Sequence, residues 1–222
     1  MKRNVKPRVG LTRCNFDINS STYKGDIMRI RNLLFTAFAV FFIANLAFAV
    51  PIYKVDPVHS DVGFKVSHLV ISKVRGNFTE FEGEIGFDKN NLGDSYIKGI
   101  IQVKSINTNN EDRDSHLRSN DFFAADDYPQ IKFESEEIMQ RGGDYVALGD
   151  LTMRGVTREV EVPFTVSGPI EHPNGKKVIA LSGGLKVDRQ DYGIAFNKTL
   201  DSGGLVVGNE VEIELEIEAI EQ

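Results

Sequence analysis

Few side chains in this sequence have the spacing that catalysis or metal binding requires. The four histidines, His59, His68, His116 and His172, include no pair with metal-ligand spacing such as His-Glu-x-x-His. The chain also lacks a Gly-x-Ser-x-Gly nucleophile motif, a phosphate-binding loop and a Cys-x-x-Cys pair. These residue types therefore predict no catalytic residue, no metal site and no cofactor chemistry, and they favour a binding protein.

Single polar side chains could still orient a ligand. His68 shares the strand parity of Phe64 and Val66, so it could point inward to a ligand head group, or be a wall residue at a strand end. His116, beside Arg113 and Asp114, fits a structural ion-pair network better than chemistry.

The remaining polar candidates have simple structural explanations. His59, following Asp56, could brace the first strand, and His172 lies in an exposed turn. Three arginines could have structural roles: Arg154, Arg158 and Arg189. Alternatively, one of them could bind a pyrophosphate or quinone head group.

The N-terminal region has the pattern of a secretory signal. Arg29 and Arg31 precede an apolar run at residues 33–43, and Ala47-Phe48-Ala49 offers a small-x-small cleavage site. The run is short for a membrane span of about 20 residues, which is the alternative. We therefore expect a signal peptide at residues 28–49, preceded by an upstream extension at residues 1–27 that is not translated if Met28 is the start.

Removing residues 1–49 takes away eight basic and two acidic residues from totals of 26 and 32, and leaves a formal net charge of −12. Such a chain repels nucleic acid and anionic lipid head groups. Cys14, the only cysteine, is also removed. The remaining 173 residues, 50–222, are enough for one domain with one core and no disulfide.

Alternation of apolar and polar residues predicts a mostly β domain. In Val211 to Ala219 every second residue is apolar and the others are glutamates, a pattern that no helix could segregate. Similar segments are residues 62–66, 81–87, 97–103, 131–133, 145–153, 160–166 and 181–187. Short turn signals separate most of them. About eight antiparallel strands could close into a barrel or form a two-sheet sandwich.

One long connection, residues 105–133, contains a short helix and a pair of aromatic residues. Asn109 or Asn110 can cap a helix running through Arg113 and Leu117. The residues in and around this connection resemble the signature of the YceI-like family: Arg113, Asp114, His116, Leu117, Asp121, Phe122, Phe123, Tyr128 and Pro129. Further matching residues are Tyr53-Lys54-Val55-Asp56, His59-Ser60, residues 149–157, Arg189, Asp191, Tyr192 and Gly193.

The resemblance covers residues 53–219 and implies a secreted, periplasmic, lipocalin-like β-barrel that holds a long isoprenoid lipid. It favours the barrel over the sandwich, and it marks Arg113, His116, Arg154 and Arg189 as candidates for contact with the lipid head group. The expected partner is an isoprenoid lipid of the quinone or polyprenyl phosphate type, held for storage or transport, with a role in stress as a further expectation. The sequence leaves open whether the protein forms a homodimer. Binding of nucleic acid and stable membrane insertion after signal cleavage are not expected.

The expected lumen is apolar and has no carboxylate, which suits a hydrocarbon. The expected lumen residues are Phe64, Val66, His68, Phe81, Ile85, Phe87, Ile101, Phe133, Leu151, Met153, Phe164, Leu185, Ile213 and Leu215. Phe122, Phe123 and Tyr128 are expected at its mouth as a lid, although the two phenylalanines could instead pin the helix. The alternatives are a lumen filled by its own side chains in a structural protein, or an enzyme that modifies such lipids with His68 or His116 as base.

Overall fold

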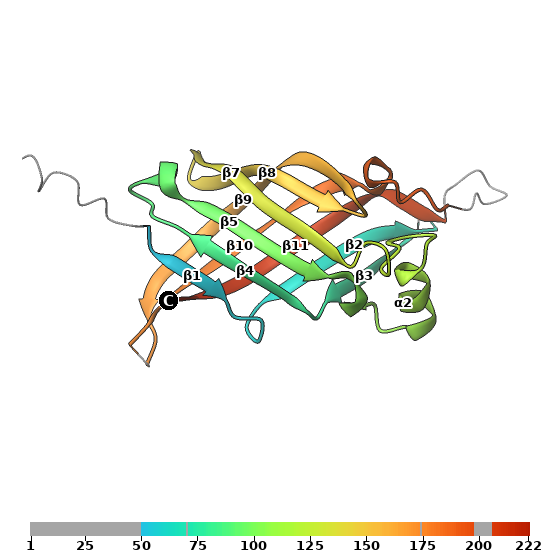
Figure 1. Cartoon of the computed structure of the whole chain (residues 1–222), viewed down its shortest axis with the longest axis horizontal. Coiled ribbons are helices and arrows are strands. Elements are labelled where there is room, and N and C mark those ends of the chain that lie inside the picture. The colour runs from blue at the N-terminus through green and yellow to red at the C-terminus, as the bar shows by residue number, and fades with distance from the viewer. Residues whose placement is uncertain (1–49, 70, 174, 198–205) are drawn as a thin grey trace, which may run out of the picture. The chain divides into compact units, whose positions relative to one another are not determined.

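The computed structural model describes residues 50–69, 71–173, 175–197 and 206–222 (Figure 1). The upstream extension and the signal peptide expected from the sequence lie outside these residues. The described residues form β1 (Ile52–Val55), β2 (Asp61–His68), β3 (Ser72–Phe78), β4 (Phe81–Gly86), β5 (Tyr96–Gln102), β6 (Ile106–Asn107), α2 (Glu111–Arg118), β7 (Gln130–Arg141), β8 (Asp144–Met153), β9 (Val156–Glu171), β10 (Lys177–Asp188) and β11 (Val207–Glu221).

The strands form a closed antiparallel β-barrel, as the family resemblance implied. Hydrogen-bonded neighbours follow the order β1-β4-β5-β7-β8-β9-β10-β11, and β1 pairs with β11 to close the ring of eight. Sequential strands are neighbours almost throughout, which short turns allow in an antiparallel sheet. The sandwich alternative is therefore wrong, because closure leaves no second sheet.

β11 explains how the ring closes. One edge of this long strand pairs with β10 along its length, while the other edge pairs first with β2, from Val207 to Glu216, and then with β1, from Ala219 to Glu221. A turn separates β1 from β2. In this turn the Ser60 Oγ donates to the Asp56 carbonyl at 2.7 Å and accepts from the Glu218 amide at 2.9 Å. β1 and β2 therefore share one edge of β11.

The membership of the ring differs from the sequence prediction in one strand. Residues 62–66 were counted among the eight, but β2 belongs to an extension that runs β2-β3-β6 away from the ring. β1 takes its place in the ring. β1 and β3 escaped prediction because β1 has four residues and β3 carries only two large apolar side chains, Val74 and Phe78.

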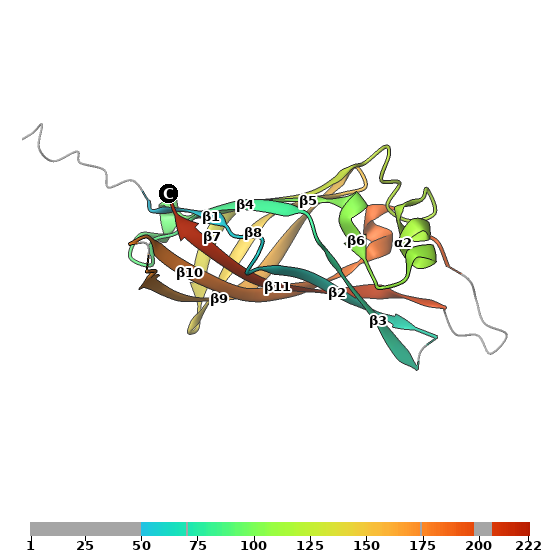
Figure 2. The same cartoon turned by 90° about the horizontal axis from the view of Figure 1, so that it is seen from below.

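The β2-β3 extension and α2 lie at the same end of the barrel (Figure 2). α2 begins after Asn110, whose side-chain oxygen accepts from the Arg113 amide at 2.9 Å. This confirms Asn110 as the cap, whereas Asn109 takes a left-handed φ of 58° that asparagine tolerates. Asp114, buried in the helix, accepts from the amide and hydroxyl of Thr108 and ties α2 to the segment after β6.

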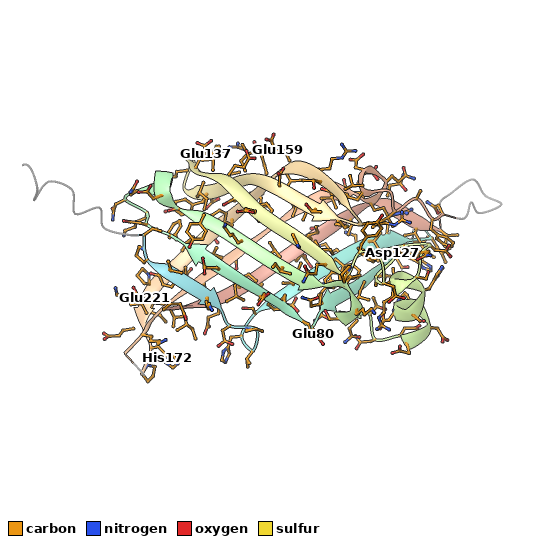
Figure 3. The ribbon with its side chains drawn as sticks, in the orientation of Figure 1. Glu80, Asp127, Glu137, Glu159, His172 and Glu221 are labelled. Atoms are coloured by element: carbon orange, nitrogen blue, oxygen red, sulfur yellow. The ribbon has the colours of Figure 1, made fainter. Side chains whose placement is uncertain are left out.

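The barrel interior contains two apolar clusters. One, toward α2, includes Val62, Phe78, Val103 and Phe122, and the other, toward the opposite end, includes Tyr53, Ile85, Phe87, Ile179 and Ala219. Residues that pack against both clusters lie between them: Phe133, Val160, Leu185, Leu215 and Ile217. Acidic side chains such as Glu80, Asp127, Glu137 and Glu159 point outward around the surface (Figure 3).

Candidate functional site

The lumen of the barrel contains a cavity of about 240 Å³. Its wall is formed almost wholly by apolar side chains that strand alternation directs inward. Twelve of the residues predicted for the lumen line this cavity: Phe64, Val66, Phe81, Ile85, Ile101, Phe133, Leu151, Met153, Phe164, Leu185, Ile213 and Leu215. Along most of this wall a hydrocarbon would bind without leaving a polar group unpaired, because the side chains there are apolar.

Two other residues predicted for the lumen lie elsewhere. His68 ends β2 opposite Ser72 and Val207, at the tip of the extension, and is outside the cavity wall. Its parity is inward, but the end of β2 extends beyond the closed ring. Phe87 follows β4 at the other end and packs edge-on against Tyr145 at 5.1 Å between ring centroids, so it belongs to the cluster that fills that end.

A glycine widens the middle of the lumen, which the sequence analysis did not foresee. It is Gly99, whereas the space beside its partner Gly83 is taken by the Val55 side chain, which a Cβ there would meet at 2.8 Å. Gly83 of β4 and Gly99 of β5 are directly opposite each other, on the inward face between Phe81 and Ile85 and between Ile97 and Ile101. A Cβ on Gly99 would have no atom within 4 Å. The signal was present in the sequence, since both glycines share the parity of lumen residues, but which strands pair is not visible there.

The segment after α2 covers the lumen at the α2 end. Phe122 is 6% exposed and packs against Phe196 and His116, with ring centroids 4.9 and 5.0 Å away. Phe123 packs edge-on against Phe78 at 6.2 Å. Both phenylalanines line the cavity, as expected of a mouth, and Phe122 also belongs to the core cluster, as expected if they pin the helix.

Tyr128, the third residue expected at the mouth, does not line the cavity. It is 41% exposed, and its ring lies over Gly155 in the turn between β8 and β9. A side chain at Gly155 would collide with that ring, so the contact joins the long connection to this turn. Tyr128 therefore packs at the surface against the turn between β8 and β9 and is not part of a lid over the cavity.

Of the four head-group candidates that the family resemblance marks, three hold loops together. Arg113 donates to the Thr108 hydroxyl at 2.7 Å and to its carbonyl at 2.8 Å. His116 is 2.8 Å from an Asp121 carboxylate oxygen. Arg154 donates to the Gly193 carbonyl and, at 2.9 Å, to the Asn120 carbonyl. None of the three lines the cavity.

Arg189 is the head-group candidate that reaches the lumen. It begins the 3₁₀ turn Arg189–Tyr192 directly after β10, is buried, and lines the cavity at the α2 end. Burial lowers the pKa of its guanidinium from the ordinary value, with the nearby Asp188 acting in the opposite direction. Its charge remains, because an arginine pKa starts far above neutral pH.

His59 braces the turn between β1 and β2. Its Nδ1 lies 2.9 Å from Asp56 Oδ2 and 3.8 Å from Glu218 Oε1. The hydrogen bond to Asp56 raises the pKa of His59 and lowers that of Asp56. Within the described parts of the chain this trio is the one group with metal-ligand geometry, and its hydrogen bonds already account for it as a brace.

The described residues include no helix long and apolar enough to cross a membrane.

Relatives in sequence share most of the domain. A UPF0312 protein of Staphylococcus epidermidis is 38% identical over 167 residues, which are 75% of this chain and 95% of that protein. A UPF0312 protein of Staphylococcus aureus is 34% identical over the same shares of the two chains.

Solved structures share the fold. A YceI protein of Campylobacter jejuni superimposes with a TM-score of 0.60 at 31% identity, over 75% of this chain and 96% of its own. BcnA of Burkholderia cenocepacia gives a TM-score of 0.66 at 24% identity, over 74% and 98% of the two chains. A polyisoprenoid-binding domain from Saccharophagus degradans gives 0.58 at 16% identity, over 77% and 98%.

The family model described as the YceI-like domain matches residues 53–219, the span that contains both the closed barrel and the connection that covers its lumen. With relatives and solved structures aligned over the same barrel, this chain belongs to the YceI-like family.

Proposed function

We propose that this protein binds an isoprenoid lipid in the barrel lumen and stores or transports it. The observation that carries the proposal is the cavity of about 240 Å³, enclosed by inward apolar side chains of the strands. The solved domain from Saccharophagus degradans that shares this fold is described as polyisoprenoid-binding, which supports the same ligand class here. Burial of a hydrocarbon chain gains about 0.8 kcal/mol per methylene, so a few isoprene units offset the cost of association.

The size of the cavity implies that the lumen adjusts to its ligand. Pockets for drug-sized ligands measure roughly 300–1,000 Å³, and the cavity here is smaller. A long chain must therefore displace side chains at one end. Phe122 and Phe123 are suited to this, because they belong to a connection and not to the hydrogen-bonded wall.

Two observations favour binding over the alternatives. The histidines that an isoprenoid-modifying enzyme would use as base, His68 and His116, both lie outside the cavity wall. A lumen filled by its own side chains would leave no room beside Gly99, where an added Cβ meets nothing within 4 Å.

Gly99→Leu tests the proposal because it fills the lumen without disturbing the wall. An added Cβ at Gly99 meets no atom within 4 Å, and leucine suits a strand better than glycine, so the fold should be retained. Gly143→Leu is the matched control, since a Cβ at this exposed position in the turn between β7 and β8 also meets nothing within 4 Å.

We expect native mass spectrometry to find bound lipid on the wild type and on Gly143→Leu, and much less on Gly99→Leu. In titrations with geranylgeraniol, Gly99→Leu should bind about tenfold more weakly or worse, as overpacking costs 1–3 kcal/mol. Equal binding by both folded variants would contradict a lumen site.

We also propose that the protein acts in the periplasm after cleavage of residues 28–49. The basic residues, apolar run and small-x-small site in the sequence support this. Intact mass measurement of the protein from a periplasmic extract should give a chain that begins at Val50. Recovery of unprocessed chain from the cytosol alone would refute export, and precursor peptides from residues 1–24 would refute a start at Met28.

A further inference from the structure

None of the hydrogen bonds that Arg189 donates to the described residues goes to a carboxylate. Its side chain is 4% exposed. Nε donates to the Gly208 carbonyl at 2.9 Å, one terminal nitrogen donates to the Ile194 carbonyl at 2.6 Å, and the other donates to the Asn209 side-chain oxygen at 3.3 Å. All three acceptors are neutral, and no carboxylate of the described residues bonds to the guanidinium.

Donor capacity also remains on this side chain. A guanidinium has five N–H groups, one on Nε and two on each terminal nitrogen. The three bonds use the Nε donor and one donor on each terminal nitrogen. One N–H on each terminal nitrogen therefore has no acceptor among the described residues, and a planar guanidinium can bind an oxyanion through two such donors.

Arg189 differs in this respect from the other ionisable residues of the cavity wall, Glu82 and Lys98. Those two occupy outward positions on β4 and β5 beside the glycine pair, and Lys98 forms an ion pair with Glu134 at 2.6 Å on the outside of the barrel. Along the described wall, the lumen is an apolar tube with a single buried cation near one end. A buried charge that no carboxylate hydrogen-bonds is unfavourable, and an anionic ligand group beside it would relieve the cost.

We propose that Arg189 binds the anionic head group of the lipid, so that the ligand is a prenyl phosphate rather than a neutral quinone. This inference rests on the proposed function. The phosphate lies at the α2 end, beside Arg189, and the hydrocarbon chain extends past the glycine pair toward Phe164. The net charge of −12 on the expected mature chain disfavours anions at the surface, so a buried anchor of this kind is what would select them.

The test compares two probes that differ only in the head group, geranylgeranyl monophosphate and geranylgeraniol, bound by the delipidated mature protein. The quantity measured is the ratio of the two affinities within each variant, because partial unfolding reduces both affinities alike. We expect the wild type to prefer the phosphate. Arg189→Met should reduce that preference by roughly tenfold to a hundredfold, as the loss of charge-assisted hydrogen bonds would.

A second variant protects the test against a folding defect. Asn209→Asp keeps the shape of the residue that accepts from Arg189 and supplies a carboxylate in place of a neutral acceptor. We expect it to fold and to lose most of the phosphate preference. Arg158→Met is the control, because Arg158 is exposed at the same end, donates to the Asp191 carbonyl and does not line the cavity. Its preference should equal that of the wild type.

Equal affinity of the wild type for both probes, or an unchanged ratio in folded Asn209→Asp, would overturn the anchor and leave lipid binding intact. Binding of neither probe to the wild type would instead overturn the proposed function.

Discussion

At the residue scale, strand parity and hydrogen-bond partners together determine what each polar side chain does. Arg113, His116 and Arg154 bond to loop atoms outside the cavity, while Arg189 lines the cavity. At the surface, the role of His59 also follows from its hydrogen-bond partner, because Asp56 lies three residues earlier in the same turn. Because this pair is exposed, its contribution to stability is small and screened by salt.

The His59 and Asp56 pair gives a pH-dependent prediction. The folded pKa of His59 is raised above 6.5, so its contribution is complete below that pH and is lost as pH rises through the folded pKa. The folded pKa of Asp56 is lowered below 3.8, so its contribution is complete above that pH and is lost as pH falls through the folded pKa. The pair therefore stabilises the turn most between pH 3.8 and pH 6.5.

We expect His59→Gln to lower the melting temperature more at about pH 5.5 than at about pH 8.5. Thermal unfolding followed by circular dichroism at both pH values measures this difference, with the wild type at the same two pH values as the reference. A decrease of the same size at both values would show that the protonated ring contributes nothing.

At the element scale, the connection from α2 to β7 closes a barrel that the strands alone leave open. α2 is capped by Asn110 and tied down by Thr108, so the helix holds the following residues over the lumen. Phe122 and Phe123 line the cavity from this connection. Gating by these rings and pinning of the helix are separable because they imply different stability costs.

The double change Phe122→Ala and Phe123→Ala is expected to speed lipid release. If the connection opens locally to let lipid pass, the loss of its rings should raise the off-rate while most of the stability of the barrel remains. Fluorescent-lipid off-rates and denaturant unfolding would be measured on the same preparation. An unchanged off-rate with a loss of several kcal/mol in the free energy of unfolding would show that the rings pin the helix.

At the scale of the whole molecule, closure depends on the short strand β1. It joins β4 and β11 through three paired positions on each side, and its Tyr53 side chain is 3% exposed in the cluster with Ile85 and Ala219. An open barrel would expose two strand edges and the apolar lumen, so β1 protects against aggregation as well as enclosing a ligand.

Tyr53→Ala should lower the free energy of unfolding by about 3–5 kcal/mol, the usual cost of removing a buried aromatic ring. Lys54→Ala, whose side chain is exposed on the same strand, should change it by less than about 0.5 kcal/mol. Urea unfolding of both variants measures the difference, and faster amide exchange in β4 and β11 of Tyr53→Ala would locate the opened seam. Equal costs would mean that β1 does not hold the ring closed.

Much of the barrel could be predicted from local pattern. The glutamates of β11 alternate with Val211, Ile213 and Leu215, and the structure places the two sets on opposite faces. The cap at Asn110 was likewise readable, because it depends on residues three positions apart. Such features follow from the sequence by itself, since the period of a strand and the first turn of a helix are set by neighbouring residues.

Other features depended on contacts between distant segments. Parity assigned His68 to the inward face but could not reveal that β2 leaves the ring before it, and it could not show that Gly83 lies opposite Gly99. Arg113, Arg154 and Arg189 were equivalent as motif residues, and only the positions of Thr108, Gly193 and the lumen separate them. The sequence by itself determined which face each side chain takes; the tertiary structure decided which faces enclose the cavity, because barrel closure joins strands far apart in the chain.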